Sequence, residues 1–226
     1  MKGSYMRSMI VRPAILAAFA LLAACGNGAP ADAQPAAPSD PLAWTIGPVI
    51  RGRNYSVGAA LHPAANRGGG LRIDLPRAPG SVHYVTFRHG SLAGKRRIVM
   101  RYRIEAARGA RLVASSDPRF PAMITLYFQR SGDNWSGRGR FETYRWYATF
   151  ASQSPLTPGD HVLVAPLDGA WTAVETSRVA TSPAAFRQAV AAADQVGFVL
   201  GGGDGVGHGV SATGPARLIV TDFRVE

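Results

Sequence analysis

The stretch Ile98-Val99-Met100-Arg101-Tyr102-Arg103-Ile104 indicates the fold class more clearly than any other segment of this sequence. Apolar side chains recur at every second position, and Arg101 and Arg103 fall between them. Because successive side chains of a strand point to opposite faces of a sheet, this alternation is typical of a strand with one buried and one solvated face. The core is therefore expected to be built from β-strands.

Runs of the same kind recur along the chain, separated by clusters of Gly, Pro, Asp and Asn. Strands are predicted at residues 71–75, 82–87, 98–104, 124–130, 141–150, 161–165, 196–200, 210–212 and 217–225. One helix is predicted, with Ser182 as N-cap, Pro183 at its first position and good helix formers from 184 to 193. Many short strands with one helix predict an all-β protein: a single antiparallel β-sandwich (jelly roll) with one short helix.

The start of the chain has the pattern of an export signal. Lys2, Arg7 and Arg12 give it a positive charge, and the ten apolar residues of 13–22 are too few to span a bilayer as a helix. The segment ends in Leu22-Ala23-Ala24-Cys25, which contains the only cysteine of the chain. This ending resembles the lipobox of bacterial lipoproteins. An ordinary signal peptide with a chance cysteine is the alternative.

The resemblance to the lipobox implies that the Cys25 sulfur is diacylated and that cleavage makes Cys25 the first residue of the mature chain. Gly26 follows, where lipoproteins retained at the inner membrane usually carry Asp. The resemblance therefore implies an outer-membrane lipoprotein whose domain faces the periplasm, with surface exposure left open. The expected organisation is a signal peptide (1–24), the lipidated Cys25 with a flexible Ala/Pro-rich tether (25–42) and the β-sandwich domain (43–226).

The charge of the chain narrows the list of partners. The formal net charge is +11, and the three basic residues that leave with the signal reduce it to +8. Only Lys2 and Lys95 are lysines, a bias more typical of a GC-rich genome than of a nucleic-acid partner. Export also removes DNA and RNA as partners. An arginine-rich surface could instead meet anionic glycans or lipid head groups, because guanidinium pairs bidentately with carboxylate and phosphate.

The layout of the predicted strands carries a second resemblance, which covers most of the domain in arrangement. The run from Val196 to Gly203, followed by Gly207-His208-Gly209-Val210 and a closing strand, is similar to the ends of some galactose-binding-domain-like β-sandwiches. Many carbohydrate-binding modules have this fold. The layout also resembles a group of proteobacterial envelope lipoproteins. Both resemblances imply a β-sandwich, and the first implies a carbohydrate ligand.

Polar and aromatic side chains gather on the outward faces of three predicted strands. They are Arg101 and Arg103 on the first, Tyr127 and Gln129 on the second, and Arg145 and Tyr147 on the third. If these strands are neighbours, the side chains form one platform, with rings that stack on sugars and planar groups that bind hydroxyls or carboxylates. The alternative is the ordinary polar face of an antiparallel sheet.

Two loops add candidates for a site. Trp135, at a predicted hairpin tip, either contacts a ligand or partner or folds back to cap the edge of the sandwich. The glycine-rich run 201–209 fits neither a dinucleotide fingerprint nor a phosphate loop, so a wide bend is expected there. Within it His208 contacts a ligand or is hydrogen-bonded structurally, and Asp204 alone does not support a calcium site. Residues 51–56 line the same cleft or form a turn.

No motif declares a cofactor or a catalytic reaction. The five histidines lack metal-ligand spacing, and no G-x-S-x-G elbow is present. Tyr127-Phe128-Gln129 is similar to the Tyr-Phe-Lys motif of jelly-roll polysaccharide lyases, but Gln stands at the Lys position and their Gln-x-His motif is missing. The leading hypothesis is a lipid-anchored, non-catalytic sandwich that binds carbohydrate, anionic glycans included. The alternatives are a structural or assembly lipoprotein with a protein partner and, third, a lyase or hydrolase.

Overall fold

The computed structural model describes residues 37–226, except 78–79, 175–176, 204 and the side chains of 150 and 151. The expected signal peptide, Cys25, most of the expected tether and Asp204 lie outside this part. Ala37 N–H donates to the Phe223 carbonyl at 3.0 Å, and the Trp44 indole donates to the Pro38 carbonyl at 2.9 Å, so the chain contacts the sandwich from Ala37 onward. None of the described helices is long and apolar enough to cross a bilayer.

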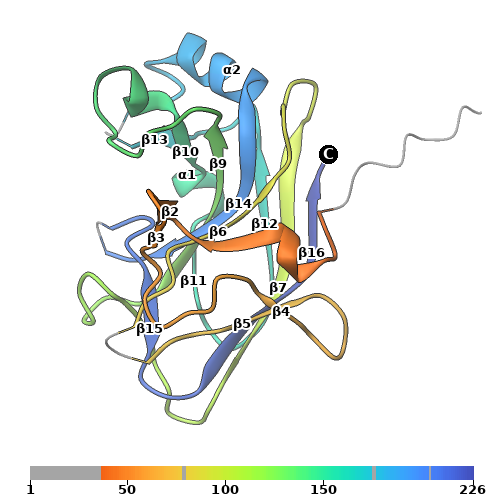
Figure 1. The fold of residues 1–226 in the computed structure, drawn as a ribbon, viewed down its shortest axis with the longest axis vertical. Coiled ribbons are helices and arrows are strands. Elements are labelled where there is room, and N and C mark those ends of the chain that lie inside the picture. Colours follow the sequence, from red (N-terminus) through yellow and green to blue (C-terminus); the bar gives the residue numbers. More distant parts are fainter. Residues whose placement is uncertain (1–36, 78–79, 175–176, 204) are drawn as a thin grey trace, which may run out of the picture. The chain divides into compact units, whose positions relative to one another are not determined.

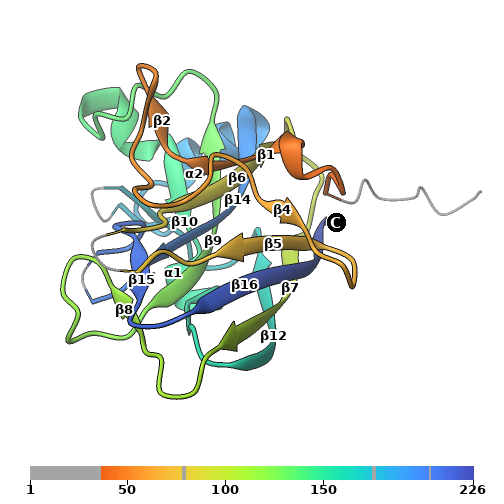
Figure 2. The same cartoon turned by 60° about the horizontal axis from the view of Figure 1, so that its bottom comes forward.

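Two antiparallel sheets form the layers of the sandwich (Figures 1 and 2). The seven-stranded sheet has the order β1-β6-β14-β9-β10-β13, with β11 paired to β9, and the five-stranded sheet has the order β12-β7-β16-β5-β4. The first sheet contains β1 (Trp44–Gly47), β6 (Tyr84–Arg88), β9 (Met123–Arg130), β10 (Arg145–Tyr147), β11 (Ser154–Pro155), β13 (Thr172–Ala173) and β14 (Ala193–Gly201). The second contains β4 (Ala64–Ala65), β5 (Leu71–Asp74), β7 (Arg97–Ala106), β12 (Gly159–Pro166) and β16 (Ala216–Val225).

Short elements complete the fold. Two further strand pairs are β2 (Val49–Ile50) with β3 (Arg53–Asn54), and β8 (Leu112–Ala114) with β15 (Val210–Ala212). The helices are η1 (Pro41–Ala43), η2 (Gly139–Thr143), α1 (Thr149–Ser152) and α2 (Pro183–Ala191).

The core lies between the two sheets. Trp44 of β1 contacts Phe87 of β6 within its own sheet, with ring centroids 4.5 Å apart, and Phe223 of β16 in the opposite sheet at 5.5 Å. In β7 the alternation predicted from the sequence holds, since Met100 and Tyr102 are buried and Arg101 is exposed. Burying apolar side chains from both layers holds the sandwich together.

These observations confirm an all-β antiparallel sandwich. Each of the nine predicted strands has a counterpart, and the predicted helix is present as α2, with Phe186 and Ala189 buried. The Ser182 side chain makes no capping hydrogen bond. The seven additional strands among the described residues have four residues or fewer, which is too short for a period to be recognised.

The prediction of one strand over 141–150 is wrong. Only Arg145–Tyr147 is extended there, as β10, and it lies between η2 and α1. Phe141 and Tyr144 contact each other with ring centroids 5.0 Å apart, and Glu142 accepts a hydrogen bond from Gly139 N–H at 3.1 Å. Phe141 and Tyr144 thus lie in and at the end of a turn of 3-10 helix, in which side chains three residues apart contact each other.

Candidate functional site

The outer face of the seven-stranded sheet, which points away from the core, carries the candidate site. Because the strand pairing is in register, side chains of this face form rows that cross the sheet. One row runs from β6 through β14 and β9 to β10 and consists of Thr86, Gly197, Tyr127 and Tyr147; the row beside it consists of Arg88, Gln195, Gln129 and Arg145. Tyr84 of β6 lies opposite Val199 of β14 on the same face.

Three tyrosines on this face form a buried cluster. The Tyr84 and Tyr147 hydroxyls are 2.9 Å apart, and Tyr127 donates to Gln129 Oε1 at 3.0 Å. Burial raises the pKa of Tyr84, and it raises the pKa values of Tyr127 and Tyr147 further. All three hydroxyls therefore stay protonated across the physiological range and act as hydrogen-bonding groups.

Arg145 forms an ion pair beneath the surface of this face. Its Nε lies 2.9 Å from Asp133 Oδ2, and the two side chains are 8% and 0% exposed. The Nε–H is not aligned for a hydrogen bond, so the contact is one of charge. Burial lowers the pKa of Arg145, but its interactions with neighbouring groups, Tyr147 and Asp133 foremost, raise it above its ordinary value. The guanidinium is therefore charged, and Asp133 balances that charge.

The same aspartate holds the loop that carries Trp135. Asp133 Oδ1 accepts from the Trp135 backbone N–H at 3.0 Å, and Asp133 Oδ2 accepts from Gln129 Nε2 at 2.9 Å. The Trp135 and Tyr84 rings meet edge-on, with centroids 5.2 Å apart. The Arg145 guanidinium carbon lies over the Trp135 ring, 4.8 Å from its centroid. Trp135 has a φ of +65°, which is uncommon for a bulky residue, so these contacts hold the backbone in a strained conformation.

A cleft of about 460 Å³ opens beside Trp135. This volume is within the range of about 300–1,000 Å³ that is typical of small-ligand sites. Polar and aromatic residues from several elements line it, among them Tyr55, His83, Tyr84, Ser115, Arg145 and His208. Tyr55 is 40% exposed, and Trp135 is half-buried, so part of each residue faces solvent at the cleft.

The glycine-rich loop forms one wall of this cleft. A Cβ at Gly207 would lie 2.6 Å from the Tyr84 hydroxyl, and a Cβ at Gly209 would lie 2.3 Å from the His83 ring. Only glycine lets the backbone approach these side chains so closely, and both glycines have positive φ. His83 Nε2 is 3.2 Å from Ser81 Oγ, and burial lowers the pKa of His83, so its ring is neutral at pH 7.

The structure brings together only part of the predicted platform. Trp135, Arg145 and His208 line the cleft. Tyr127, Gln129 and Tyr147 belong to the same face but are at most 6% exposed, and they lie beneath the loop as its support. They contact the residues that line the cleft and not the space inside it.

Arg101 and Arg103 are not part of this platform, because the condition that all three strands are neighbours is not met. Both lie on β7 in the five-stranded sheet, whereas β9 and β10 pair in the other sheet. Each points to solvent beside a carboxylate: Arg101 is 3.9 Å from Asp222, and Arg103 is 2.7 Å from Asp160. Alternation revealed their outward direction but could not reveal which sheet contained the strand.

Sequence reasoning missed Tyr84, His83 and Asp133 as members of the site. Tyr84 lies in an apolar strand that gave no reason to separate its two faces. His83 was considered only among the five histidines as a possible metal ligand, and Asp133 only as part of the turn of the predicted hairpin that carries Trp135. The alternation of Tyr84 and Thr86 with Val85 and Phe87 is the signal that could have identified the polar face.

Among the described residues, no group of three or more His, Cys, Asp or Glu side chains could hold a metal ion. No known protein family matches the chain, and no curated protein sequence matches it. One matching solved structure is described as "Prominent members of the human gut microbiota express endo-acting O-glycanases to initiate mucin breakdown". That chain is 14% identical, with a TM-score of 0.38, and the alignment covers 82% of this chain and 92% of that chain. A likeness of this degree carries no inference about function.

Proposed function

We propose that the cleft beside Trp135 binds carbohydrate. The observation that carries this proposal is the half-buried Trp135, which lines the cleft and is held at a positive φ over a buried network of Asp133, Arg145 and Tyr84. Strain of this kind costs about 1–3 kcal/mol and persists where the surrounding structure fixes it, often at ligand sites. A sugar presents a C–H face that stacks on an aromatic ring and hydroxyls that bond to polar side chains.

The remaining lining of the cleft suits such a ligand. Ser115 Oγ is buried and makes no hydrogen bond to protein, and the His208 side chain is exposed at the opening. A buried hydroxyl without a partner is costly, and a sugar hydroxyl would supply one. The charge of Arg145 is already balanced by Asp133, and His83 is neutral at pH 7. Stacking and neutral hydrogen bonds therefore dominate, and neutral as well as anionic glycans belong to the proposed ligand class.

The proposed role is binding without catalysis. None of the described residues that line the cleft is a carboxylate, so the pair of acids that most glycoside hydrolases use is not assembled there. Burial raises the pKa of Tyr84, the buried hydroxyl at its wall, so this hydroxyl stays protonated near neutral pH and is not available as a base. We expect no unsaturated product and no new reducing ends when the protein is incubated with uronate-rich polymers; either product would establish an enzyme.

A polysaccharide panel tests binding and its location. The panel contains polygalacturonate, alginate and hyaluronan as acidic polymers and amylose and xylan as neutral ones. We expect the protein to bind at least one of them, and Trp135→Gly and His208→Ala to weaken that binding severalfold. Arg101→Ala and Arg103→Ala, on the opposite sheet, are matched controls that should bind as the parent does. No binding to any polymer, or unchanged binding in both cleft variants, would contradict the proposal.

We also propose that the chain is a lipoprotein of the outer membrane, anchored through acylated Cys25. The support is the sequence Leu22-Ala23-Ala24-Cys25 after a short apolar run. Cells that express the chain should incorporate an alkyne-labelled fatty acid into it, and Cys25→Ala should abolish the label. Label that persists in Cys25→Ala, or a chain that fractionates as a soluble protein with Cys25 intact, would contradict this proposal.

A further inference from the structure

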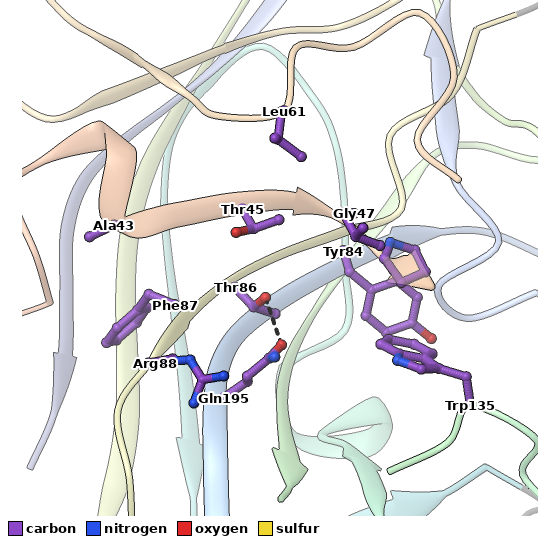
Figure 3. A pocket seen from close by; sticks show the side chains of 12 residues that line it. Ala43, Thr45, Gly47, Leu61, Tyr84, Thr86, Phe87, Arg88, Trp135 and Gln195 are labelled. Atoms are coloured by element: carbon purple, nitrogen blue, oxygen red, sulfur yellow. Dashed lines mark hydrogen bonds between the residues drawn. The ribbon is translucent and has the colours of Figure 1, made fainter. Parts of the chain in front are cut away.

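A second hollow adjoins the cleft at Trp135. It has a volume of about 390 Å³, and its lining includes Thr45, Thr86, Arg88 and Gln195 from three neighbouring strands of the same sheet (Figure 3). Pro48, Tyr84 and Trp135 line both spaces. These three residues therefore lie where the two hollows adjoin.

The chemistry of the second hollow matches that of the first. Thr86 donates to Gln195 Oε1 at 3.1 Å, which leaves the Gln195 Nε2 amide outside that bond (Figure 3). Thr45 adds a hydroxyl, and Leu61, which is 45% exposed, adds an apolar rim. Hydroxyls, an amide and an apolar edge in one hollow can bind the hydroxyls and the C–H face of a second sugar residue.

The cleft also adjoins a third hollow, which shares no lining residue with the second one. Ser116 lines both the cleft and a third space, whose other lining residues are Asp117, Phe120 and Gly203. The Phe120 ring is 46% exposed, although large aromatic side chains are mostly buried in folded proteins. The cleft beside Trp135 therefore adjoins both of the other hollows, because it shares lining residues with each of them while they share none with one another.

We infer that these three adjoining hollows form a groove for an internal stretch of a linear glycan, with sugar residues bound in the cleft beside Trp135 and in the hollows next to it. The inference rests on the proposed carbohydrate binding and deepens it, because a single terminal sugar would occupy only the cleft beside Trp135. Gln195 and Thr86 bind the chain at one end of the groove, and Phe120 stacks on it at the other. The site thus distinguishes long chains from short ones.

The test measures affinity against chain length. The probes are fragments of one, two, four and six sugar residues from the five polymers of the panel, titrated by calorimetry. For the polymer that binds, we expect the dissociation constant to fall at least about tenfold from two to six residues. Gln195→Ala should weaken binding of the six-residue fragment about three- to tenfold, the range of one hydrogen bond, and leave the two-residue fragment unchanged.

Two further variants separate the possible outcomes. Gln188→Ala, on the exposed face of α2, is the matched control and should bind every fragment as the parent does. Phe120→Ala should likewise weaken only the longer fragments. Equal affinity for two and six residues, or an equal loss for both in Gln195→Ala, would overturn the extended groove and leave the single site intact. Failure of every fragment and polymer to bind would overturn the carbohydrate proposal itself.

Discussion

Trp135 is the residue on which the proposed site depends, and its backbone conformation is its most unusual property. The φ of +65° is maintained by the Asp133 carboxylate, which accepts from the Trp135 N–H, and by ring contacts with Tyr84 and Arg145. A glycine would adopt this φ without strain but would offer no ring. A tryptophan at this position therefore costs stability, and this cost is consistent with the binding role that we propose for its ring.

Replacing Trp135 by Gly and by Ala separates strain from contact. Both changes remove the ring, so both should weaken carbohydrate binding severalfold. Ala keeps the positive-φ strain whereas Gly does not, so Trp135→Gly should be more stable than Trp135→Ala by about 1 kcal/mol. Urea denaturation measures the difference, and equal stability of the two variants would show that the conformation is not strained.

The buried ion pair of Arg145 and Asp133 leads to a prediction about the stability of the fold. Removing one member of a buried ion pair leaves the other charge uncompensated and costs about 3–5 kcal/mol. Arg145→Met should therefore destabilise the fold by about that amount. Arg101→Met, whose side chain is 55% exposed and 3.9 Å from Asp222, should change stability by less than about 0.5 kcal/mol.

Adding Asp133→Asn to Arg145→Met completes this experiment. The double variant removes the buried negative charge as well, so it should recover part of the stability lost in the single variant. If Arg145→Met and Arg101→Met were destabilised equally, Arg145 would not be the buried partner that the structure describes.

His83 gives the stability of the protein a pH dependence. Burial lowers its folded pKa below the unfolded value of about 6.5, so the unfolded chain binds more protons between these two values. The contribution of neutral His83 to the free energy of unfolding is therefore fully present above about pH 6.5, and it is lost as the pH falls through the lowered pKa. His89, whose pKa burial also lowers, contributes with the same sign.

His83→Gln, which cannot be protonated, should show a smaller loss of unfolding free energy below about pH 6.5 than the parent. Urea denaturation at pH 7.5, 6.5 and 5.5 gives the comparison. Parallel curves for the two proteins would mean that His83 is not held neutral by the fold.

At the scale of elements, the glycines of the loop between β14 and β15 allow its backbone to lie close to the side chains of Tyr84 and His83 at the cleft. Gly207 and Gly132 both have a φ of +76°, but they differ in surroundings. A Cβ at Gly207 would meet the Tyr84 hydroxyl at 2.6 Å, whereas a Cβ at Gly132 would meet nothing within 4 Å. Comparing an alanine variant at each of these two glycines therefore separates the cost of backbone strain from the cost of displacing Tyr84.

Gly132→Ala should cost about 1 kcal/mol through backbone strain alone and leave carbohydrate binding unchanged. Gly207→Ala should cost more, because Tyr84 must move, and it should also weaken binding severalfold. Denaturation and affinity electrophoresis on the same samples measure both effects. Unchanged binding in Gly207→Ala would separate Tyr84 and this loop from the site.

The elements also show what the sequence could predict. Alternation over residues 98–104 and 124–130 identified β7 and β9 and the outward direction of Arg101, Arg103, Tyr127 and Gln129. It could not show that β7 and β9 belong to different sheets, because pairing depends on contacts between residues far apart in the chain. It also could not show that the Trp135 loop buries Tyr127 and Gln129, since a face with polar side chains has the same period whether or not a loop covers it.

At the scale of the whole chain, the four tryptophans provide the most direct test. Trp44, Trp146 and Trp171 are fully buried in the core, and Trp135 is half-buried beside the cleft. Iodide added to the folded protein should therefore quench mainly Trp135. Titrating the five polysaccharides of the panel while following iodide quenching reports whether a glycan covers that ring. We predict saturable protection by at least one polysaccharide, unchanged in Arg101→Ala and reduced severalfold in affinity in His208→Ala. A polysaccharide that binds without protecting Trp135, or no protection by any of them, would contradict the central claim.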